Sequence, residues 1–171
     1  MLSIITAIGR NREMGQTGGL PWGNTMKNDR QWFRDHIDGH LIIAGRKTFE
    51  ETAAHFPRLR AVVFSRQPAT EQIKGIRYIS NVSELADLHS SSEEVFVIGG
   101  AEINALLLSY CRRLYLTRID GDFPSAEKFF PEFNEHDYRV IFSEAHDADS
   151  RNRYNYRFVV YELKADPMGI S

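Results

Sequence analysis

The stretch Leu41-Ile42-Ile43-Ala44-Gly45-Arg46-Lys47-Thr48 joins four apolar residues to a glycine and a polar, basic segment. Four consecutive apolar residues suit a strand that is buried on both faces, as in a parallel sheet. Gly45 ends this strand, and the helix that begins near Arg46 ends before Pro57, because proline cannot continue a helix. This strand–turn–helix unit predicts an α/β protein.

Similar units lie on both sides of this stretch. The last two expected strands are joined by a polar segment from His146 to Arg153, which favours an antiparallel hairpin at the sheet edge. Together the elements predict a three-layer α/β fold with a mostly parallel sheet of eight strands and about four helices. The expected strands are 2–8, 41–44, 61–64, 76–79, 95–98, 113–119, 138–145 and 154–163, and the expected helices are 28–38, 46–56, 82–89 and one after Gly99-Gly100.

Length and composition indicate one globular domain. We expect residues 1–165 of the 171 to form it and residues 166–171 to be a flexible tail. The balance of 21 Lys+Arg against 23 Asp+Glu gives no general reason to expect nucleic acid or membrane binding. The N-terminus has no basic region followed by a long apolar run, so a cytoplasmic protein is expected. Cys111 is the only cysteine, which excludes an intrachain disulfide, and it should pack as a small buried hydrophobe.

Asp29 is the first candidate functional residue. It follows the loop Leu20-Pro21-Trp22 and lies in an expected helix beside Trp32 and Phe33. A carboxylate on an apolar helix face is costly to bury unless a polar group meets it. Asp29 is therefore a candidate acid, or a clamp for a ligand that donates hydrogen bonds, and the alternative is a solvated aspartate at a helix start.

Three strand-to-helix junctions carry residues that suit phosphate: Gly45-Arg46-Lys47-Thr48, Ser65-Arg66 and Gly99-Gly100-Ala101. In open α/β sheets, ligands bind beyond the carboxyl ends of the strands, where helix N-termini direct backbone N–H groups outward. Each junction alone could be only a tight turn. The three together fit an extended, doubly phosphorylated cofactor, and the surplus cations favour NADP(H) over NAD(H).

Two other kinds of chemistry lack support in the sequence. The six histidines and the single cysteine show no spacing typical of metal ligands, so no metal site is expected. A G-x-S-x-G motif is absent from the sequence, which argues against a serine hydrolase.

Colinear motifs along the chain resemble those of the dihydrofolate reductase family, most closely its chromosomal bacterial members. They are Ile5-Thr6-Ala7, Gly15, Leu20-Pro21-Trp22, Asp29 with Trp32-Phe33, 45–50, Ser65-Arg66, Val97-Ile98-Gly99-Gly100, 116–120, Phe130-Pro131 and 142–149. The resemblance implies the family's twisted eight-stranded sheet and a monomer. It also implies NADPH-dependent reduction of 7,8-dihydrofolate to 5,6,7,8-tetrahydrofolate, with hydride transfer to C6 and protonation of N5, in support of one-carbon and thymidylate metabolism.

The resemblance further implies roles for single residues. Asp29 would hold the pterin and favour protonation of N5, Thr117 would hydrogen-bond Asp29, and Trp22 would hold a water. Residues 9–20 would form a lid over the nicotinamide, with Leu20 counted among the catalytic residues. Substrate-binding positions would be Ile5, Thr6, Asp29, Arg30, Phe33, Thr52, Phe56, Arg60, Ile98 and Thr117. Cofactor-binding positions would be Ala7, Met14, Gly15, Leu20, Gly45, Arg46, Lys47, Thr48, Ser65, Arg66, Ser80, Gly99, Gly100, Ala101, Glu102 and Ile103.

Several positions depart from the family pattern. Two extra residues precede Asp29, and we expect the loop to bulge at Gly23-Asn24-Thr25. Leu59 stands where the family has an arginine for the glutamate α-carboxylate, which leaves Arg30, Arg58 or Arg60 as candidates for that role. Asn104 replaces a tyrosine near the nicotinamide, and Glu102 replaces a cation near the phosphates.

Two other functions stay open at this point. One is a pteridine or flavin-precursor reductase of the same fold. The other is a non-catalytic folate- or nucleotide-binding protein.

Overall fold

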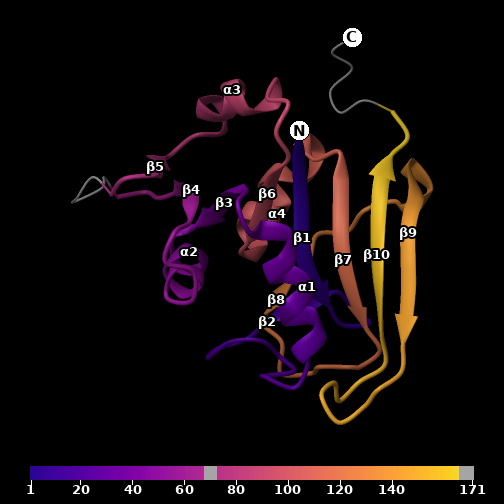
Figure 1. Cartoon of the computed structure of the whole chain (residues 1–171). Coiled ribbons are helices and arrows are strands. Elements are labelled where there is room, and N and C mark those ends of the chain that lie inside the picture. Colours follow the sequence, from indigo (N-terminus) through magenta and orange to yellow (C-terminus); the bar gives the residue numbers. More distant parts are fainter. Residues whose placement is uncertain (68–72, 166–171) are drawn as a thin grey trace.

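The computed structural model describes residues 1–67 and 73–165 of the chain, and the expected tail at 166–171 lies outside them. The main sheet contains β1 (Leu2–Ile8), β3 (Leu41–Gly45), β4 (Arg60–Phe64), β5 (Ile76–Ile79), β6 (Val95–Gly99), β7 (Arg113–Ile119), β9 (Tyr138–His146) and β10 (Tyr156–Leu163). Their order is β5-β4-β3-β6-β1-β7-β10-β9 (Figure 1). Within this sheet all pairings are parallel except those of β10 with β7 and β9. The predicted sheet, with its antiparallel edge hairpin, is confirmed.

The part of the chain that the structure describes contains four α-helices, as expected: α1 (Lys27–Ile37), α2 (Arg46–Ala53), α3 (Ala86–His89) and α4 (Ala101–Leu107). The helix expected over 82–89 is divided into a 3-10 helix, Val82–Leu85, and the short α3. Asn81 and Glu84 form a capping box around the 3-10 segment, which places its start firmly after β5. Further 3-10 turns occupy Leu108–Tyr110 and Glu135–Asp137.

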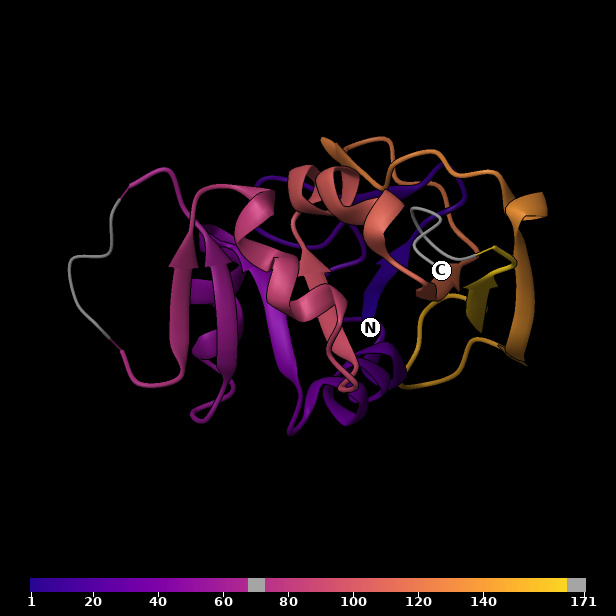
Figure 2. The same cartoon turned by 90° about the horizontal axis from the view of Figure 1, so that it is seen from above.

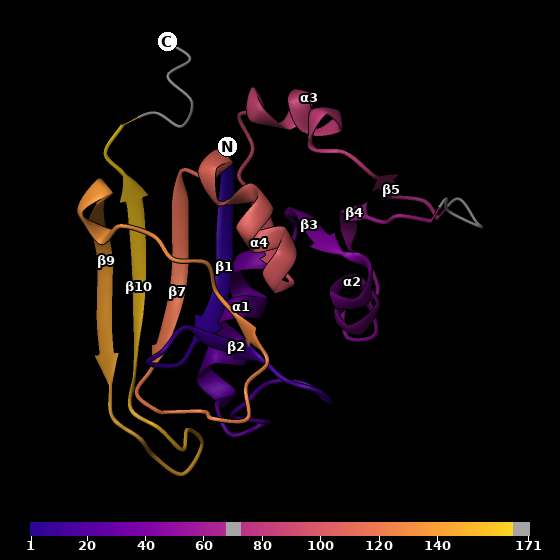
Figure 3. The same cartoon turned by 180° about the vertical axis from the view of Figure 1, so that it is seen from behind.

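Alternation along the strands sends side chains to two separate cores. Ile4 and Ile43 pack with Leu85, Leu88 and Leu107 on the side of α3 and α4. The neighbouring residues Ile5 and Ile42 pack with Ile37 and Phe49 on the side of α1 and α2. Figures 2 and 3 show the sheet between these two helical layers. Successive strand residues point to opposite faces, so these strands are apolar throughout because both faces are covered.

A second, two-stranded sheet was not predicted. It pairs β2 (Glu13–Gly15) with β8 (Lys128–Phe129). Glu13 is only 3% exposed, and its carboxylate accepts hydrogen bonds from the backbone N–H of Asn11 at 2.8 Å and of Phe123 at 3.2 Å. Strands of two or three residues are too short to show alternation in the sequence. This small sheet ties the middle of the glycine-rich 9–20 loop to β8.

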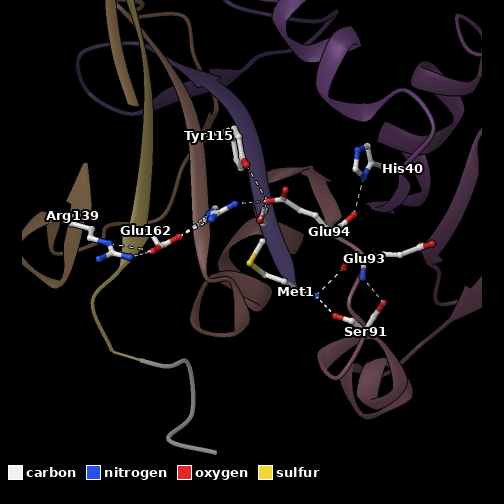
Figure 4. A network of polar contacts seen from close by, with 10 residues as sticks. Met1, His40, Ser91, Glu93, Glu94, Tyr115, Arg139 and Glu162 are labelled. Atoms are coloured by element: carbon white, nitrogen blue, oxygen red, sulfur yellow. Dashed lines mark hydrogen bonds and ion pairs between the residues drawn. The ribbon is translucent and has the colours of Figure 1, made fainter. Parts of the chain in front are cut away.

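Polar side chains link the amino ends of the central strands (Figure 4). Glu94 accepts hydrogen bonds from the hydroxyls of Ser3 at 2.5 Å and Tyr115 at 3.0 Å. The carboxylate of Glu162 lies between the guanidinium groups of Arg113 and Arg139. This network cross-links β1, β7, β9 and β10 at the end of the sheet that faces away from the carboxyl ends of β1 and β6.

Candidate active site

A cavity of about 310 Å³ opens beside the carboxyl-terminal halves of β1 and β6, between α1 and α2. It brings together eleven residues that the sequence predicted for substrate or cofactor: Ile5, Thr6, Ala7, Leu20, Asp29, Arg30, Phe33, Thr48, Thr52, Phe56 and Ile98. Arg34, Glu51 and His55 also line it and were not predicted. The spacing of Arg30 and Arg34, one helical turn apart, is the feature of the sequence that could have pointed to Arg34.

Asp29 is the buried carboxylate of this cavity. It lies in the first turn of α1 and is 8% exposed. Burial disfavours the charged form and raises the pKa of Asp29 to about 6. The Thr117 hydroxyl and the Arg30 guanidinium act in the opposite direction on this pKa and only partly offset the burial. A carboxyl group with such a pKa can hold or release a proton near neutral pH, which a solvated aspartate at a helix start could not do.

Two hydrogen-bond donors predicted for this site are buried without a partner. Thr117 is 1% exposed, and its Oγ1 makes no hydrogen bond of standard geometry within the described chain, although it lies near enough to Asp29 to lower its pKa. The indole Nε1 of Trp22 also has no partner there, and Trp22 is 3% exposed and packs edge-on against Phe123. Unpaired buried donors are costly unless a ligand or water meets them.

The loop before α1 accommodates the two extra residues. Residues 21–24 form a turn in which Gly23 adopts a φ of +59°, a left-handed conformation that favours glycine. The Thr25 hydroxyl donates to the Trp22 carbonyl at 2.6 Å, and Arg30 donates to Asn24 Oδ1 at 3.0 Å. The predicted bulge at Gly23-Asn24-Thr25 therefore corresponds to a compact turn that leaves Asp29 in the first turn of the helix.

Arg58 and Arg60, the other candidates for the glutamate carboxylate, lie apart from Arg30. Arg60 donates to the Gly39 carbonyl at 3.0 Å, and its guanidinium is 3.8 Å from Glu93. Neither Arg58 nor Arg60 is among the residues that line the cavity. Leu59 is half-buried and packs against the core on the side of α1 and α2.

The starts of α2 and α4 meet beside the cavity and suit a dinucleotide. Neither helix has a side-chain cap, so within the described chain the N–H groups of their first turns are not satisfied by a capping side chain. A Cβ on Gly45 would lie 3.3 Å from Ile103 and 3.8 Å from the Gly100 nitrogen, and one on Gly100 would lie 3.4 Å from the Thr48 hydroxyl. These glycines keep open a cradle between two helix starts, which fits a pyrophosphate group.

The other predicted cofactor residues lie on several different elements. Arg46 binds Glu50 and Gln67, each at 2.9 Å, and Lys47, Arg66 and Glu102 are exposed. The hydroxyl of Ser65 donates to the Gln67 carbonyl, and the backbone N–H of Ser80 donates to Glu84. Ala101 lies at the start of α4, and Gly15 lies in β2.

Asn104 occupies the position next to the expected nicotinamide site. It is fully buried, and its amide lies 3.8 Å from the sulfur of Met14. Its Oδ1 has no hydrogen-bond partner within the described chain. The amide oxygen of Asn104 is therefore available to accept a hydrogen bond.

The described residues contain neither a metal cluster nor a membrane-spanning helix. No group of three or more His, Cys, Asp or Glu side chains in residues 1–67 and 73–165 is placed to hold a metal ion. None of the helices described is long and apolar enough to span a membrane.

Comparisons with known proteins agree with this geometry. The chain is 38% identical to a dihydrofolate reductase of Bacillus subtilis over 164 residues, which cover 96% of this chain and 95% of that protein. It is 31% identical to a dihydrofolate reductase of Haemophilus influenzae, covering 95% and 98%. The structure resembles dihydrofolate reductase from Enterococcus faecalis complexed with NADP(H) and RAB-propyl, with a TM-score of 0.82, 26% identity and coverage of 96% and 97%. The family model for dihydrofolate reductase matches residues 1–163, and the chain thus belongs to the dihydrofolate reductase family.

Proposed function

We propose that the cavity beside Asp29 is where this reductase converts 7,8-dihydrofolate to 5,6,7,8-tetrahydrofolate. The observation that carries the proposal is the buried carboxyl group of Asp29, whose pKa of about 6 lies near neutral pH, in a cavity that adjoins two uncapped helix starts. The residues at those helix starts, among them Gly45 and Gly100, would hold NADPH, which would supply the hydride for C6 of the substrate.

Asp29 is assigned the role of holding the pterin and its proton. A carboxylate accepts hydrogen bonds from the amino group and the ring N–H of a pterin, which are both donors. Because Asp29 is buried, its negative charge is poorly screened and raises the proton affinity of the bound ring at N5. The carboxylate does not have to reach N5 itself, since a water can deliver the proton.

Thr117 and Trp22 support this assignment as donors that lack partners. The hydroxyl of Thr117 can donate to Asp29 and orient the carboxylate, and the indole N–H of Trp22 can hold a water. Ile5, Phe33, Phe56 and Ile98 give the cavity apolar walls that exclude other water. Orienting two reactants in a dry cavity supplies a large part of the rate in reactions of this kind.

The test is the loss of absorbance at 340 nm when the protein is mixed with 7,8-dihydrofolate and NADPH. We expect turnover with this pair and much slower oxidation with NADH, because the basic residues at the cofactor junctions favour the 2′-phosphate. Tight NADPH binding without any oxidation would instead identify a non-catalytic binding protein. Turnover of a flavin precursor, but not of dihydrofolate, would identify the alternative reductase.

We further propose that the protein works as a monomer in the cytoplasm, without a nucleic acid partner. A single chain brings Asp29, Phe33 and Ile98 together in this cavity, which supports a site that works without a second copy. Sedimentation velocity with and without NADPH tests this, and a dimer that dissociates with loss of activity would contradict it.

A further inference from the structure

Helix α1 begins without a capping side chain of its own. Met26 precedes its first turn, and this apolar side chain accepts no hydrogen bond from the helix. The first N–H groups of an α-helix have no partner within the helix, and burying them unpaired is costly. The start of α1 therefore needs acceptors from another part of the chain. Asp29 lies within this first turn, so those acceptors bear directly on the cavity.

The connection between β9 and β10 supplies acceptors to the start of α1 (Figure 1). The backbone N–H of Lys27 donates to the Arg151 carbonyl at 3.2 Å. The backbone N–H of Asn28 donates to Oδ1 of Asn152 at 2.9 Å. Met26 and Asn152 also form an isolated β-bridge. Asn152 thus caps α1 from a position 124 residues further along the chain than Asn28.

The side chain of Asn152 is itself fixed by Asp149. Asn152 is fully buried, and its Nδ2 donates to Oδ1 of Asp149 at 3.0 Å. The same carboxylate oxygen accepts the backbone N–H groups of Arg151 and Asn152, each at 2.8 Å. Because Asp149 engages the NH₂ end of the amide, the oxygen of the amide is the end that faces α1.

The side chain of Asn28 makes a second attachment to the same region. Its Nδ2 donates to the hydroxyl of the buried Tyr156 at 2.7 Å. The backbone and the side chain of Asn28 are therefore both bound to the segment 152–156. Since Asp29 is the next residue, a movement of this turn would change how deeply its carboxyl group is buried.

We propose that Asn152 is a positioning residue for Asp29: it caps α1 from outside the helix and holds the turn that keeps this carboxyl group buried in the cavity. Asn152 is not among the residues that line the cavity, so it acts through the helix rather than on the substrate. The inference rests on the proposed function for the part that Asp29 plays in the reaction.

The charged and titratable groups that face Asp29 are unchanged in variants of Asn152. They are Arg30 and Arg34 of α1, Glu51 and His55 on the other wall of the cavity, and Tyr156 of β10. A change at Asn152 therefore reaches Asp29 through the position of the helix turn, or through a charge added at residue 152 itself.

The test measures the position of Asp29 and the reaction separately. NMR of labelled aspartate carboxyl groups across pH gives the pKa of Asp29 in the ligand-free protein, and single-turnover oxidation of NADPH with 7,8-dihydrofolate gives the rate. Asn152→Ala removes the acceptor, whereas Asn152→Asp keeps an oxygen for the Asn28 N–H. Asn134→Ala is the matched control, because the exposed Asn134 caps a 3-10 turn through its oxygen and donates to Asp137 through its Nδ2.

We expect Asn152→Ala to lower the pKa of Asp29 from about 6 by at least about half a unit, because a looser turn admits water to the carboxyl group. The midpoint of the rate profile should move down with it, and the rate at neutral pH should fall about threefold or more, in proportion to the lost proton occupancy. Asn152→Asp retains the cap and adds a negative charge, so the pKa of Asp29 should stay or rise. Asn134→Ala should change neither quantity.

A wild-type pKa of Asp29 in Asn152→Ala would overturn the proposal. A pKa below the wild-type value in Asn152→Asp would also overturn it, because the retained oxygen would then not act as a cap, and this variant decides the matter if Asn152→Ala does not fold. A lowered pKa of Asp29 in Asn152→Ala with an unchanged rate would support the positioning role and would instead refute the proposed part of Asp29 in the reaction.

Discussion

The Asp29→Asn substitution is expected to raise the free energy of unfolding at neutral pH. Burial raises the pKa of Asp29 from its ordinary value of 3.8 to about 6, and each pH unit of difference corresponds to about 1.4 kcal/mol. Between these two values the folded protein holds a proton that the unfolded chain has released. The stability contributed by this group therefore falls as pH rises through that window, and the full cost of about 3 kcal/mol is present above about pH 6.

Asparagine carries no charge and avoids this cost. Its new amide donor would be imperfectly paired beside Thr117 and Arg30, so we expect a net gain of about 1–3 kcal/mol at pH 8 and a smaller one below pH 5. Urea denaturation followed by tryptophan fluorescence at both pH values measures the difference. The exposed Asp35 of the same helix is the control, and Asp35→Asn should change stability by less than about 0.5 kcal/mol. A less stable Asp29→Asn protein at pH 8, or a gain that does not depend on pH, would refute the reasoning.

Two further predictions concern the network and the cofactor cradle. Glu162→Gln should cost about 1–3 kcal/mol of unfolding free energy at pH 7, because Arg113 and Arg139 would lose a carboxylate that is only 6% exposed. The control is Glu132→Gln, which removes a carboxylate from an exposed ion pair and should cost less than about 0.5 kcal/mol. The same arginines hold the pKa of Glu162 below its ordinary value of 4.5, so its stabilisation is present above that pH and should disappear in acid denaturation series as pH falls. Gly45→Ala should weaken NADPH binding about tenfold in a fluorescence titration, since the added Cβ would lie 3.3 Å from Ile103, and unchanged affinity would remove the cradle from the cofactor site.

Local sequence patterns were sufficient to predict most strands of the main sheet. The strands at 2–8, 76–79 and 113–119 match the structure in both bounds, because each has a clear apolar or alternating pattern ended by a turn. The helix at 82–89 was only partly right, since the capping box at Asn81 and Glu84 favours a short 3-10 start. The small β2–β8 sheet depends on contacts between segments 110 or more residues apart, which no local pattern contains.

The features of the site also divide into those that the local sequence predicts and those that only the fold reveals. Asp29 could be singled out because a carboxylate among aromatic residues is unusual, whereas its pKa depends on burial that only the fold supplies. Thr117 comes near it because β7 pairs with β1 in a register that places Thr117 opposite Ala7. Arg34 was missed because an arginine on a helix is normally solvated, and its contact with Phe56 needs α1 and α2 to be placed first.

The most direct test of the account is the rate of NADPH oxidation in a single turnover with 7,8-dihydrofolate, measured for the wild type and for Asp29→Asn between about pH 5 and pH 9. We expect the wild-type rate to fall as pH rises above about 6, because the one proton shared by Asp29 and the bound ring is then lost to solvent. Asp29→Asn should be slower by about 100-fold or more at neutral pH and should lose that pH dependence. Wild-type turnover by Asp29→Asn at neutral pH would contradict the central claim that this carboxyl group governs protonation of the substrate.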